Sequence, residues 1–378
     1  MKQKNLLILI ALTLGIVILA AIAVNSRDAG VTEDAKDTKL FPGLLGKIND
    51  VDSIEILSGG GTITLIKQDN SWRVKESNQY YANLSKIKAA LLGIEDYSLI
   101  EAKTSKAELY EKLGVDDASA AGAKSTQVTI KDDSGADLAS LIIGNRRPGS
   151  KPQQYVRKTG SEQSWLVNGF VTLDKQANNW LDKTIVDLKR DAVRSVTIKH
   201  KNPITISREN AGDPDFSIEN LQPQKKIKSQ GIVNLIAGTL ENLSLEDVMP
   251  AAKFDMASAQ STATDFSTFD GQVIHIEVAA KDDKWYLRLT SEFQAPAAAA
   301  ATEIKLAADT TTSPDKAEPS ADQATGDHPT PASTPATRSP EQIISTSDQI
   351  NNRTKDWIYV IPKSKAENIT RQLKDLVE

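Results

Sequence analysis

The sequence VDSIEI at residues 51–56 recurs as VRSVTI at residues 193–198, and this repetition decides the fold. Both copies alternate apolar and polar residues with a period of two, which predicts a half-buried β-strand. Two further segments recur in the same order, TITL at 62–65 as PITI at 203–206 and SWRVKE at 71–76 as DFSIEN at 215–220. A fourth match, YSLIEA at 97–102 with LSLEDV at 243–248, is interpreted as the exit from the helix of each copy, and the offset between matched segments stays between 141 and 146 residues. We therefore expect one structural unit that occurs twice.

The remainder of each copy predicts a helix, four more strands and a closing helix. Apolar residues three and four apart predict a helix over 84–94 in the first copy and over 232–243 in the second. The later strands are expected at 127–131, 137–143, 154–157 and 165–167, then at 265–269, 272–279, 285–290 and 357–361, and the closing helices at 173–181 and 363–377. This order indicates the α+β class, with an antiparallel sheet and helices on one face. We place the two repeats at residues 41–190 and 191–378.

The second repeat contains a stretch of very different composition at residues 292–340. It holds seven of the fifteen prolines, is rich in Ala, Thr, Ser and Asp, and has no aromatic residue after Phe293. Such a composition cannot bury enough apolar surface to offset the entropy of ordering its backbone. We therefore expect a disordered insert between two strands of the second repeat.

The N-terminus contains an uncharged apolar run from Leu6 to Val24. As a helix, these residues span roughly 28 Å, close to the ~30 Å hydrocarbon core of a bilayer. Lys2 and Lys4 precede the run, so the positive-inside rule places the N-terminus in the cytoplasm and the remainder outside it. We predict a single-pass bacterial inner-membrane protein with residues 1–24 as cytoplasmic tip and span, 25–40 as a tether, and a periplasmic body. A cleaved signal peptide is the alternative, since Ala21-Ile22-Ala23 fits a cleavage site.

Composition excludes several functions. The chain has no cysteine, which rules out disulfides, thiolate catalysis and Cys-ligated metals. Its net charge of −5 is spread along the sequence and forms no basic stripe, so a nucleic-acid partner is not expected. None of the three histidines has metal-ligand spacing, and no G-x-S-x-G nucleophile motif occurs. We predict no cofactor, no metal and no enzymatic activity.

One polar cluster stands out as a candidate ligand site. Arg146 and Arg147 lie in a loop that Tyr155 and Arg157 follow closely, and arginine forks beside a tyrosine suit a carboxylate, a phosphate or a sugar acid. The alternative is a solvated loop with Arg157 pointing outward. Two carboxylate pairs, Glu95-Asp96 and Glu246-Asp247, favour structural exit turns over acid–base chemistry because both follow the predicted helices.

A string of short motifs resembles a known bacterial family. The motifs are FPGL at 41–44, NDVDSIEI at 49–56, WRV at 72–74, AKTS at 102–105, YEKLGV at 110–115, IG at 143–144, YVR at 155–157 and WLDK at 180–183. In order and spacing they resemble the domain of unknown function 4340, over most of residues 40–290 and again at the C-terminus. The resemblance implies an envelope protein with one N-terminal span, associated with ABC transporters of the gliding-motility type, and it implies no catalytic residue.

These observations predict a periplasmic binding or scaffolding protein that is accessory to an ABC-type transport complex. Its expected partners are membrane lipid, through the N-terminal helix, and permease or auxiliary subunits of the transporter. The alternative is a cell-envelope adaptor that binds peptidoglycan or polysaccharide through an exposed sheet face. A third hypothesis, an envelope hydrolase, is disfavoured by the missing motifs.

Overall fold

The computed structural model describes residues 38–59, 61–120, 122–149, 151–257, 259–295 and 338–378. The chain divides into two compact units, Met1–Asp182 and Lys183–Glu378, whereas the sequence analysis placed the boundary after residue 190. The predicted span at 6–24 lies outside the described residues. Within those residues, no helix is both long and apolar enough to cross a membrane.

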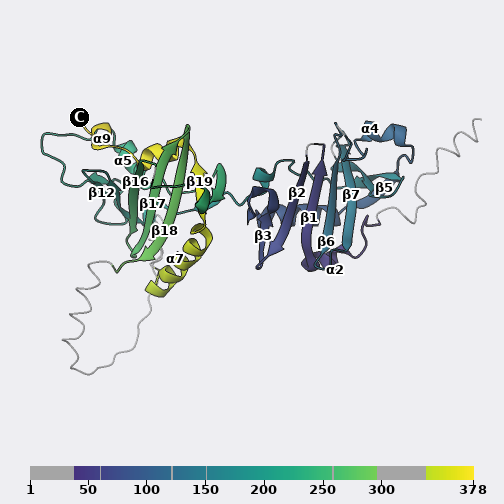
Figure 1. Cartoon of the computed structure of the whole chain (residues 1–378), viewed down its shortest axis with the longest axis horizontal. Coiled ribbons are helices and arrows are strands. Elements are labelled where there is room, and N and C mark those ends of the chain that lie inside the picture. Colours follow the sequence, from purple (N-terminus) through teal and green to yellow (C-terminus); the bar gives the residue numbers. More distant parts are fainter. Residues whose placement is uncertain (1–37, 60, 121, 150, 258, 296–337) are drawn as a thin grey trace, which may run out of the picture. The chain divides into compact units, whose positions relative to one another are not determined.

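The first unit is built on one nine-stranded antiparallel sheet (Figure 1). The strand order is β4-β3-β2-β1-β6-β7-β8-β9-β5. The strands are β1 Val51–Ser58, β2 Gly61–Gln68, β3 Ser71–Val74, β4 Tyr80–Tyr81, β5 Ser98–Ala102, β6 Thr126–Asp132, β7 Asp137–Arg146, β8 Gln153–Lys158 and β9 Ser164–Asn168. The sequence analysis missed β5, which it interpreted only as the exit from a helix.

Three α-helices and four short 3-10 helices complete the described part of this unit around the sheet. They are α2 Leu44–Lys47, α3 Leu84–Glu95 and α4 Tyr110–Leu113, with η2 Ile48–Asp50, η3 Lys75–Ser77 and η4 Ala107–Leu109 among the 3-10 turns. A further 3-10 turn, η5 Ala177–Trp180, precedes the unit boundary. The Asn83 side chain caps α3 by accepting a hydrogen bond from the Lys86 amide, and Ile87, Leu91 and Ile94 are buried. The apolar spacing therefore predicted α3 to within one residue.

The closing helix expected at 173–181 is wrong, because only the 3-10 turn η5 forms there. Asp174 holds this segment in an irregular path. Its carboxylate accepts hydrogen bonds from Lys86 and Asn179, and its carbonyl accepts one from the Trp180 indole. These local side-chain bonds compete with helical backbone pairing.

The expected tether at residues 25–40 is also too long. The Leu40 amide donates to the carbonyl of Tyr97, so residues 38–40 already join the sheet.

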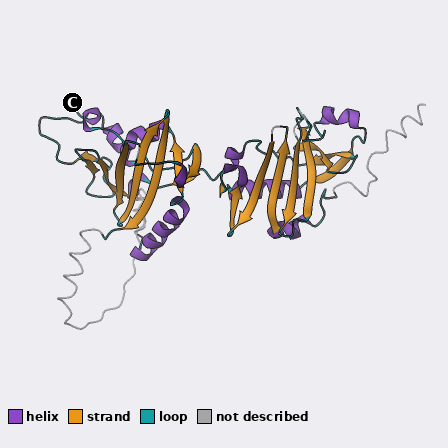
Figure 2. Cartoon of the chain, viewed as in Figure 1, coloured by secondary structure: helices purple, strands orange, loops and turns teal. Residues whose placement is uncertain are grey.

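The second unit contains an eight-stranded antiparallel sheet of order β13-β12-β11-β16-β17-β18-β19-β15. The strands are β11 Val193–Lys199, β12 Ile204–Ser207, β13 Ser217–Ile218, β15 Asp247–Pro250, β16 Ser261–Thr268, β17 Gln272–Lys281, β18 Lys284–Phe293 and β19 Trp357–Ile361. A small separate sheet pairs β10 Thr184–Val186 with β14 Leu243–Ser244. The expected α+β class with antiparallel sheets is confirmed (Figure 2).

Eight of the nine strands of the first sheet, all except β4, correspond to the eight strands of the second. The order 3-2-1-6-7-8-9-5 in the first sheet matches 13-12-11-16-17-18-19-15 in the second. A β-bulge lies between Val51 and Ser53 where β1 pairs β6, and the same irregularity lies between Val193 and Ser195 where β11 pairs β16. A 3-10 turn precedes each of these strands, η2 before β1 and η6 Arg190–Ala192 before β11. Shared topology and a shared bulge support an internal duplication.

The helices of the second unit correct two sequence predictions. The first helix, α5 Gln230–Ala237, is shorter than the expected 232–243, because the chain turns at Gly238–Asn242, where Asn242 has a φ of 50°. The helix expected at 363–377 is two helices, α8 Lys363–Ile369 and α9 Leu373–Leu376, since the Gln372 and Asp375 side chains cap a new start. The described part of this unit also has a 3-10 turn, η7 Ala251–Lys253.

The predicted insert at 292–340 is too wide at both ends. Strand β18 continues to Phe293, and α7 Pro340–Thr354, which the sequence analysis did not predict, begins with a capping box formed by Ser339 and Gln342. Residues 296–337 lie outside the described part of the chain.

Helices cover the apolar face of the second sheet, where Thr264 donates a hydrogen bond to the carbonyl of Ile369 in α8. The opposite face is polar and carries the candidate site.

Candidate functional site

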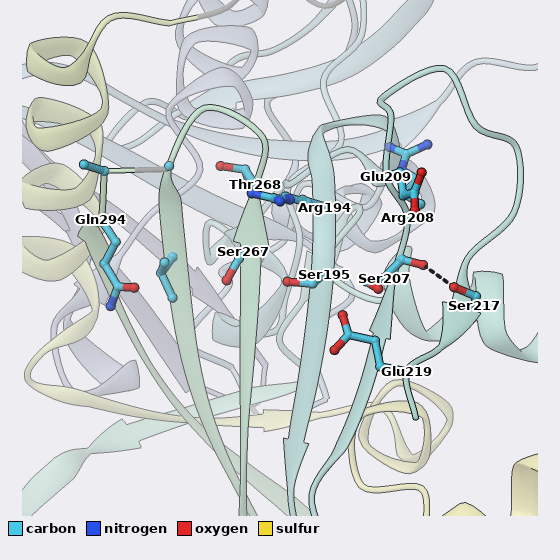
Figure 3. A pocket seen from close by; sticks show the side chains of 13 residues that line it. Arg194, Ser195, Ser207, Arg208, Glu209, Ser217, Glu219, Ser267, Thr268 and Gln294 are labelled. Carbon is cyan, nitrogen blue, oxygen red and sulfur yellow. Dashed lines mark hydrogen bonds between the residues drawn. The ribbon is translucent and has the colours of Figure 1, made fainter. Parts of the chain in front are cut away.

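A polar groove lies on the face of the second sheet that no described helix covers (Figure 3). Its volume is about 610 Å³. Strands β11, β12, β13, β16 and β17 and the residues that follow β18 supply its lining, which consists of Arg194, Ser195, Ser207, Arg208, Glu209, Ser217, Glu219, Ser267, Thr268, Gly271, Val273, Gln294 and Ala295. Two arginines and two glutamates belong to this lining, so the groove carries no net charge.

Four serines form a row across this groove. Ser217 on β13 pairs with Ser207 on β12, Ser207 pairs with Ser195 on β11, and Ser195 pairs with Ser267 on β16. Residues directly opposite each other on neighbouring strands present their side chains on the same face. The four hydroxyls therefore share one face at intervals of ~4.8 Å, the distance between adjacent strands. We call this set the serine row.

Most of the serine row is free to bind a ligand. Ser217 Oγ donates to the Ser207 carbonyl at 3.2 Å, but the hydroxyls of Ser195, Ser207 and Ser267 have no hydrogen-bond partner among the residues that the structure describes. The next row along the same strands differs, because the hydroxyls of Thr197 and Thr205 bond each other at 3.2 Å. Hydroxyls that are half-buried and unpaired by protein are available to a ligand that both donates and accepts hydrogen bonds.

Arg208 fixes one end of the groove and directs most of its hydrogen-bond donors to the backbone. The side chain is 6% exposed, lies against the rings of Phe216 and Phe269, and donates to the carbonyls of Val193, Asp213, Arg190 and Asp191. Burial lowers the pKa of the Arg208 guanidinium from its usual value, although a guanidinium stays protonated at neutral pH. The charged groups at the rim that remain for a ligand are Arg194, Glu209 and Glu219, all exposed and without an ion pair within the described segments.

A charged cluster lies one step along the same face. His275 contacts the carboxylates of Asp265 at 2.8 Å and Glu292 at 3.2 Å, and Lys199 pairs with Asp265 at 2.6 Å. Burial alone would raise the pKa of Asp265, but the hydrogen bonds from Lys199 and His275 hold it below its usual value. His275 is thus a partly buried member of an ion-pair network. In the described part of the chain, no group of His, Asp and Glu is arranged to hold a metal ion.

The structure does not bring together the four candidates of the sequence analysis. Arg146 and Arg147 are exposed at the β7–β8 turn, where Arg146 stacks on Phe170 and Arg147 donates to the Gln153 side chain. Tyr155 packs against a small cluster around Tyr110, and Arg157 is 8% exposed. Both alternatives for Arg157 are therefore incorrect: it points neither into a shared ligand site nor out to solvent.

Arg157 instead holds a loop onto the first sheet. Its Nε donates to the carbonyl of Val115, its Nη1 donates to that of Ser161, and its guanidinium stacks on Tyr110. The Tyr110 hydroxyl in turn donates to the carbonyl of Glu162. A β-carbon on Gly144 would lie 2.4 Å from the carbonyl oxygen of Leu113. Three of the motifs behind the family resemblance thus meet at the place where α4 docks on β7 and β8, and their role there is structural.

The carboxylate pairs also have structural surroundings. Lys39 bridges Glu95 at 3.4 Å and Asp96 at 2.9 Å at the end of α3. Asp247 accepts a hydrogen bond from the Val248 amide within β15. The interpretation of an exit turn is confirmed for Glu95 and Asp96, but it is wrong for the second pair, because α5 ends at Ala237 and Asp247 pairs with Val360 in the sheet.

The alternation of polar and apolar residues in the sequence carries one signal of the serine row. Ser195, Ser207, Ser217 and Ser267 occupy polar positions of alternating strands. Their alignment depends on the strand register and on the order β13-β12-β11-β16, which place Ser195 and Ser267, 72 residues apart in the sequence, side by side. Alternation alone predicts the face of each serine but not its neighbour.

Fold and site together define a protein with two tandem α+β sheet units and a hydroxyl-lined groove on the second. The family model described as domain of unknown function (DUF4340) matches residues 72–264. The chain therefore belongs to this family, as the motifs indicated, and the match begins in the first unit and ends in the second. No curated protein and no solved structure gives a significant match.

Proposed function

We propose that this chain is a single-pass inner-membrane protein whose periplasmic body binds or scaffolds other envelope components. In this proposal the apolar run at 6–24 contacts lipid, and the two sheet units act beside the permease or auxiliary subunits of an ABC-type transporter. The protein needs no cofactor, binds no nucleic acid and catalyses no reaction.

The observation that carries this proposal is the serine row on an open face. Serine acts as a nucleophile only when a general base activates it. The histidine on the same face, His275, has both ring nitrogens engaged by the carboxylates of Asp265 and Glu292. A line of unactivated hydroxyls with no net charge around it suits reversible binding and not covalent chemistry.

Recovery of the native complex tests the transporter role. The full chain, tagged at its C-terminus, is crosslinked in cells and purified in mild detergent. We expect a permease or auxiliary transporter subunit to co-purify, and a variant that lacks residues 6–24 to lose it together with the membrane fraction. Recovery of the tagged chain alone, after crosslinking, would contradict the proposal.

A second candidate function is a cell-envelope adaptor that binds peptidoglycan or polysaccharide. The groove on the second sheet, which is rich in hydroxyl groups and carries no net charge, favours it. Sedimentation with purified cell wall separates the candidates, because only the adaptor would pellet with cell wall that contains no membrane protein.

A further inference from the structure

We propose that the serine row is a binding site for an uncharged glycan chain, which lies across the strands and contacts Ser207, Ser195 and Ser267 in succession. The inference rests on the adaptor form of the proposed function and names the ligand class of its site. It depends on three features of the groove: the state of its hydroxyls, its charge and its repeat distance.

The hydroxyls define what the ligand must offer. A serine Oγ both donates and accepts, and three consecutive ones in this row lack a partner among the described residues, whereas Thr197 and Thr205 beside them satisfy each other. The matching ligand therefore carries donors and acceptors along its whole length. Sugar hydroxyls and N-acetyl amides meet this requirement at every residue of a glycan.

The charges exclude polyionic ligands. Arg194 lies at the rim with Glu209 and Glu219, and the buried guanidinium of Arg208, which already donates to four backbone carbonyls, balances the second glutamate. A polyanion or a polycation would meet no net opposing charge in this groove. Arg194 and Glu219 are suited instead to single hydrogen bonds with hydroxyl or amide groups of a neutral chain.

The repeat distance favours a glycan over a peptide. The hydroxyls recur every ~4.8 Å across the strands, while side chains on one side of an extended peptide recur every ~6.7 Å. Because the two repeat distances differ, the side chains of a peptide strand could align with only one serine of the row. One sugar ring of a β-linked glycan has about the length of the strand spacing, so successive rings can meet successive serines.

The first unit provides an internal comparison. Ser53 occupies the position in β1 that Ser195 occupies in β11, but its partners in register are Ile66 and Lys131. The corresponding row of the first sheet is therefore interrupted by an apolar side chain and by a lysine that pairs with Glu55. The glycan site belongs to the second unit alone, and Ser53 is a matched control.

Calorimetric titration of the full chain tests the inference. The protein is held in an amine-oxide detergent, because sugar-based detergents would compete for the groove. The probes are uncharged β-1,4-linked hexasaccharides of glucose and of N-acetylglucosamine, with polygalacturonate and an extended Ser/Thr-rich peptide as comparison ligands. We expect at least one hexasaccharide to bind, and neither comparison ligand to do so.

The variant Ser195→Ala/Ser207→Ala/Ser267→Ala is expected to weaken hexasaccharide binding at least tenfold. Alanine at these positions leaves the apolar face of the sheet untouched, and an unchanged thermal midpoint verifies the fold. Ser53→Ala, in the first unit, and Thr197→Val, which removes a hydroxyl that is already bonded, should each bind within twofold of the native chain.

Three results would overturn the inference: neither hexasaccharide binds, the triple variant binds as tightly as the native chain, or the peptide or polyanion binds instead. Failure here is distinguishable from failure of the transporter role. If the triple variant and the native chain both recover a transporter subunit after crosslinking while no sugar binds, the inference fails and the transporter role stands.

Discussion

Asn351 of α7 and Ser291 of β18 form two hydrogen bonds that replace those of a missing neighbouring strand. The Asn351 side chain accepts from the Ser291 amide at 2.8 Å and donates to the Ser291 carbonyl at 2.7 Å. Strand β19 pairs with β18 only at Trp285, Tyr286 and Leu287, so the later part of β18 would otherwise be a free edge. Because free edges promote association with other strands, α7 protects the sheet as well as covering it.

We expect Asn351→Ala to destabilise the second unit by about 2–4 kcal/mol. The substitution leaves both backbone groups of Ser291 without their partner, and each unpaired buried polar group costs about 1–3 kcal/mol. The free energy of unfolding in urea measures the effect. Asn352→Ala is the control, because Asn352 is exposed on the same helix. Equal stability of the two variants would show that Asn351 does not close the edge.

A buried amide network holds the first unit together at Gln154. The side chain donates to the carbonyls of Gly144 and Val171, and accepts from the Val171 amide and the Tyr97 hydroxyl. Burial raises the pKa of Tyr97 well above its usual value, so this hydroxyl remains a donor at all ordinary pH values. The network is fully paired, and truncation of Gln154 removes a partner from four groups, of which the Val171 amide keeps a second hydrogen bond, to the Tyr97 hydroxyl.

Gln154→Ala should therefore lower the free energy of unfolding of the first unit by about 3 kcal/mol, and Tyr97→Phe by about 1 kcal/mol. The neighbouring change Gln153→Ala removes one hydrogen bond to the exposed Arg147 and should cost less than about 0.5 kcal/mol. Denaturant midpoints of the three variants provide the comparison. If Gln153→Ala proved the most damaging, the importance of the buried network would be refuted.

Gly144 is required where α4 docks on the first sheet. A β-carbon there would lie 2.4 Å from the Leu113 carbonyl oxygen and 2.9 Å from that of Gly114, and neither backbone atom can rotate away. Gly144→Ala should destabilise by about 1–3 kcal/mol, the usual cost of overpacking. Gly46→Ala, inside α2 with nothing within 4 Å of the added carbon, should be neutral or slightly stabilising. Thermal midpoints distinguish the two variants, and a harmless Gly144→Ala would contradict this packing.

Asp270 gives the second unit part of its resistance to acid. Burial alone would raise the pKa of Asp270, but hydrogen bonds from Arg338 and Thr268 lower it below the usual value. A carboxyl group with a lowered pKa in the folded state stabilises the fold above the pKa of the unfolded chain. This stabilisation is lost as the pH falls through the folded-state pKa.

We therefore expect Asp270→Asn to be less stable than the native chain at neutral pH. Its urea midpoint should also fall less between about pH 5 and about pH 2. Asp283→Asn, at an exposed carboxylate in the next turn, should follow the native curve. Parallel curves for Asp270→Asn and the native chain would show that the Arg338 contact does not contribute to stability in this range.

The sequence predicted where strands and helices form better than it predicted which of them lie side by side. Period-two alternation located most strands, and the spacing of Ile87, Leu91 and Ile94 located α3. It missed α7, because that helix is largely polar and contacts β18 through Ser347, Asn351 and Thr354 and not through an apolar stripe alone. It missed the break in the C-terminal helix, where side-chain caps decide the path of the chain.

The candidate site shows the same difference between local sequence patterns, which could be predicted, and contacts between distant segments, which could not. Arg146, Arg147, Tyr155 and Arg157 are close in sequence, and that closeness suggested a site. Yet Arg157 contacts the carbonyl of Val115, a partner that only the tertiary structure supplies. The serine row, by contrast, is assembled from four strands through their register. A site of this kind leaves no local motif, so sequence reasoning could predict an exposed sheet face but not the residues on it.

Site-specific photocrosslinking in living cells shows directly what the groove contacts. A photoreactive phenylalanine analogue replaces Ser207 in the serine row or, as the comparison, Ser53 in the first sheet. We predict that the analogue at 207 captures a heterogeneous adduct of high mass that glycan-degrading enzymes reduce to the mass of the chain, and that the analogue at 53 captures none. Equal adducts at both positions, or an adduct at 207 that resists every glycan-degrading enzyme, would contradict the assignment of this face to glycan binding.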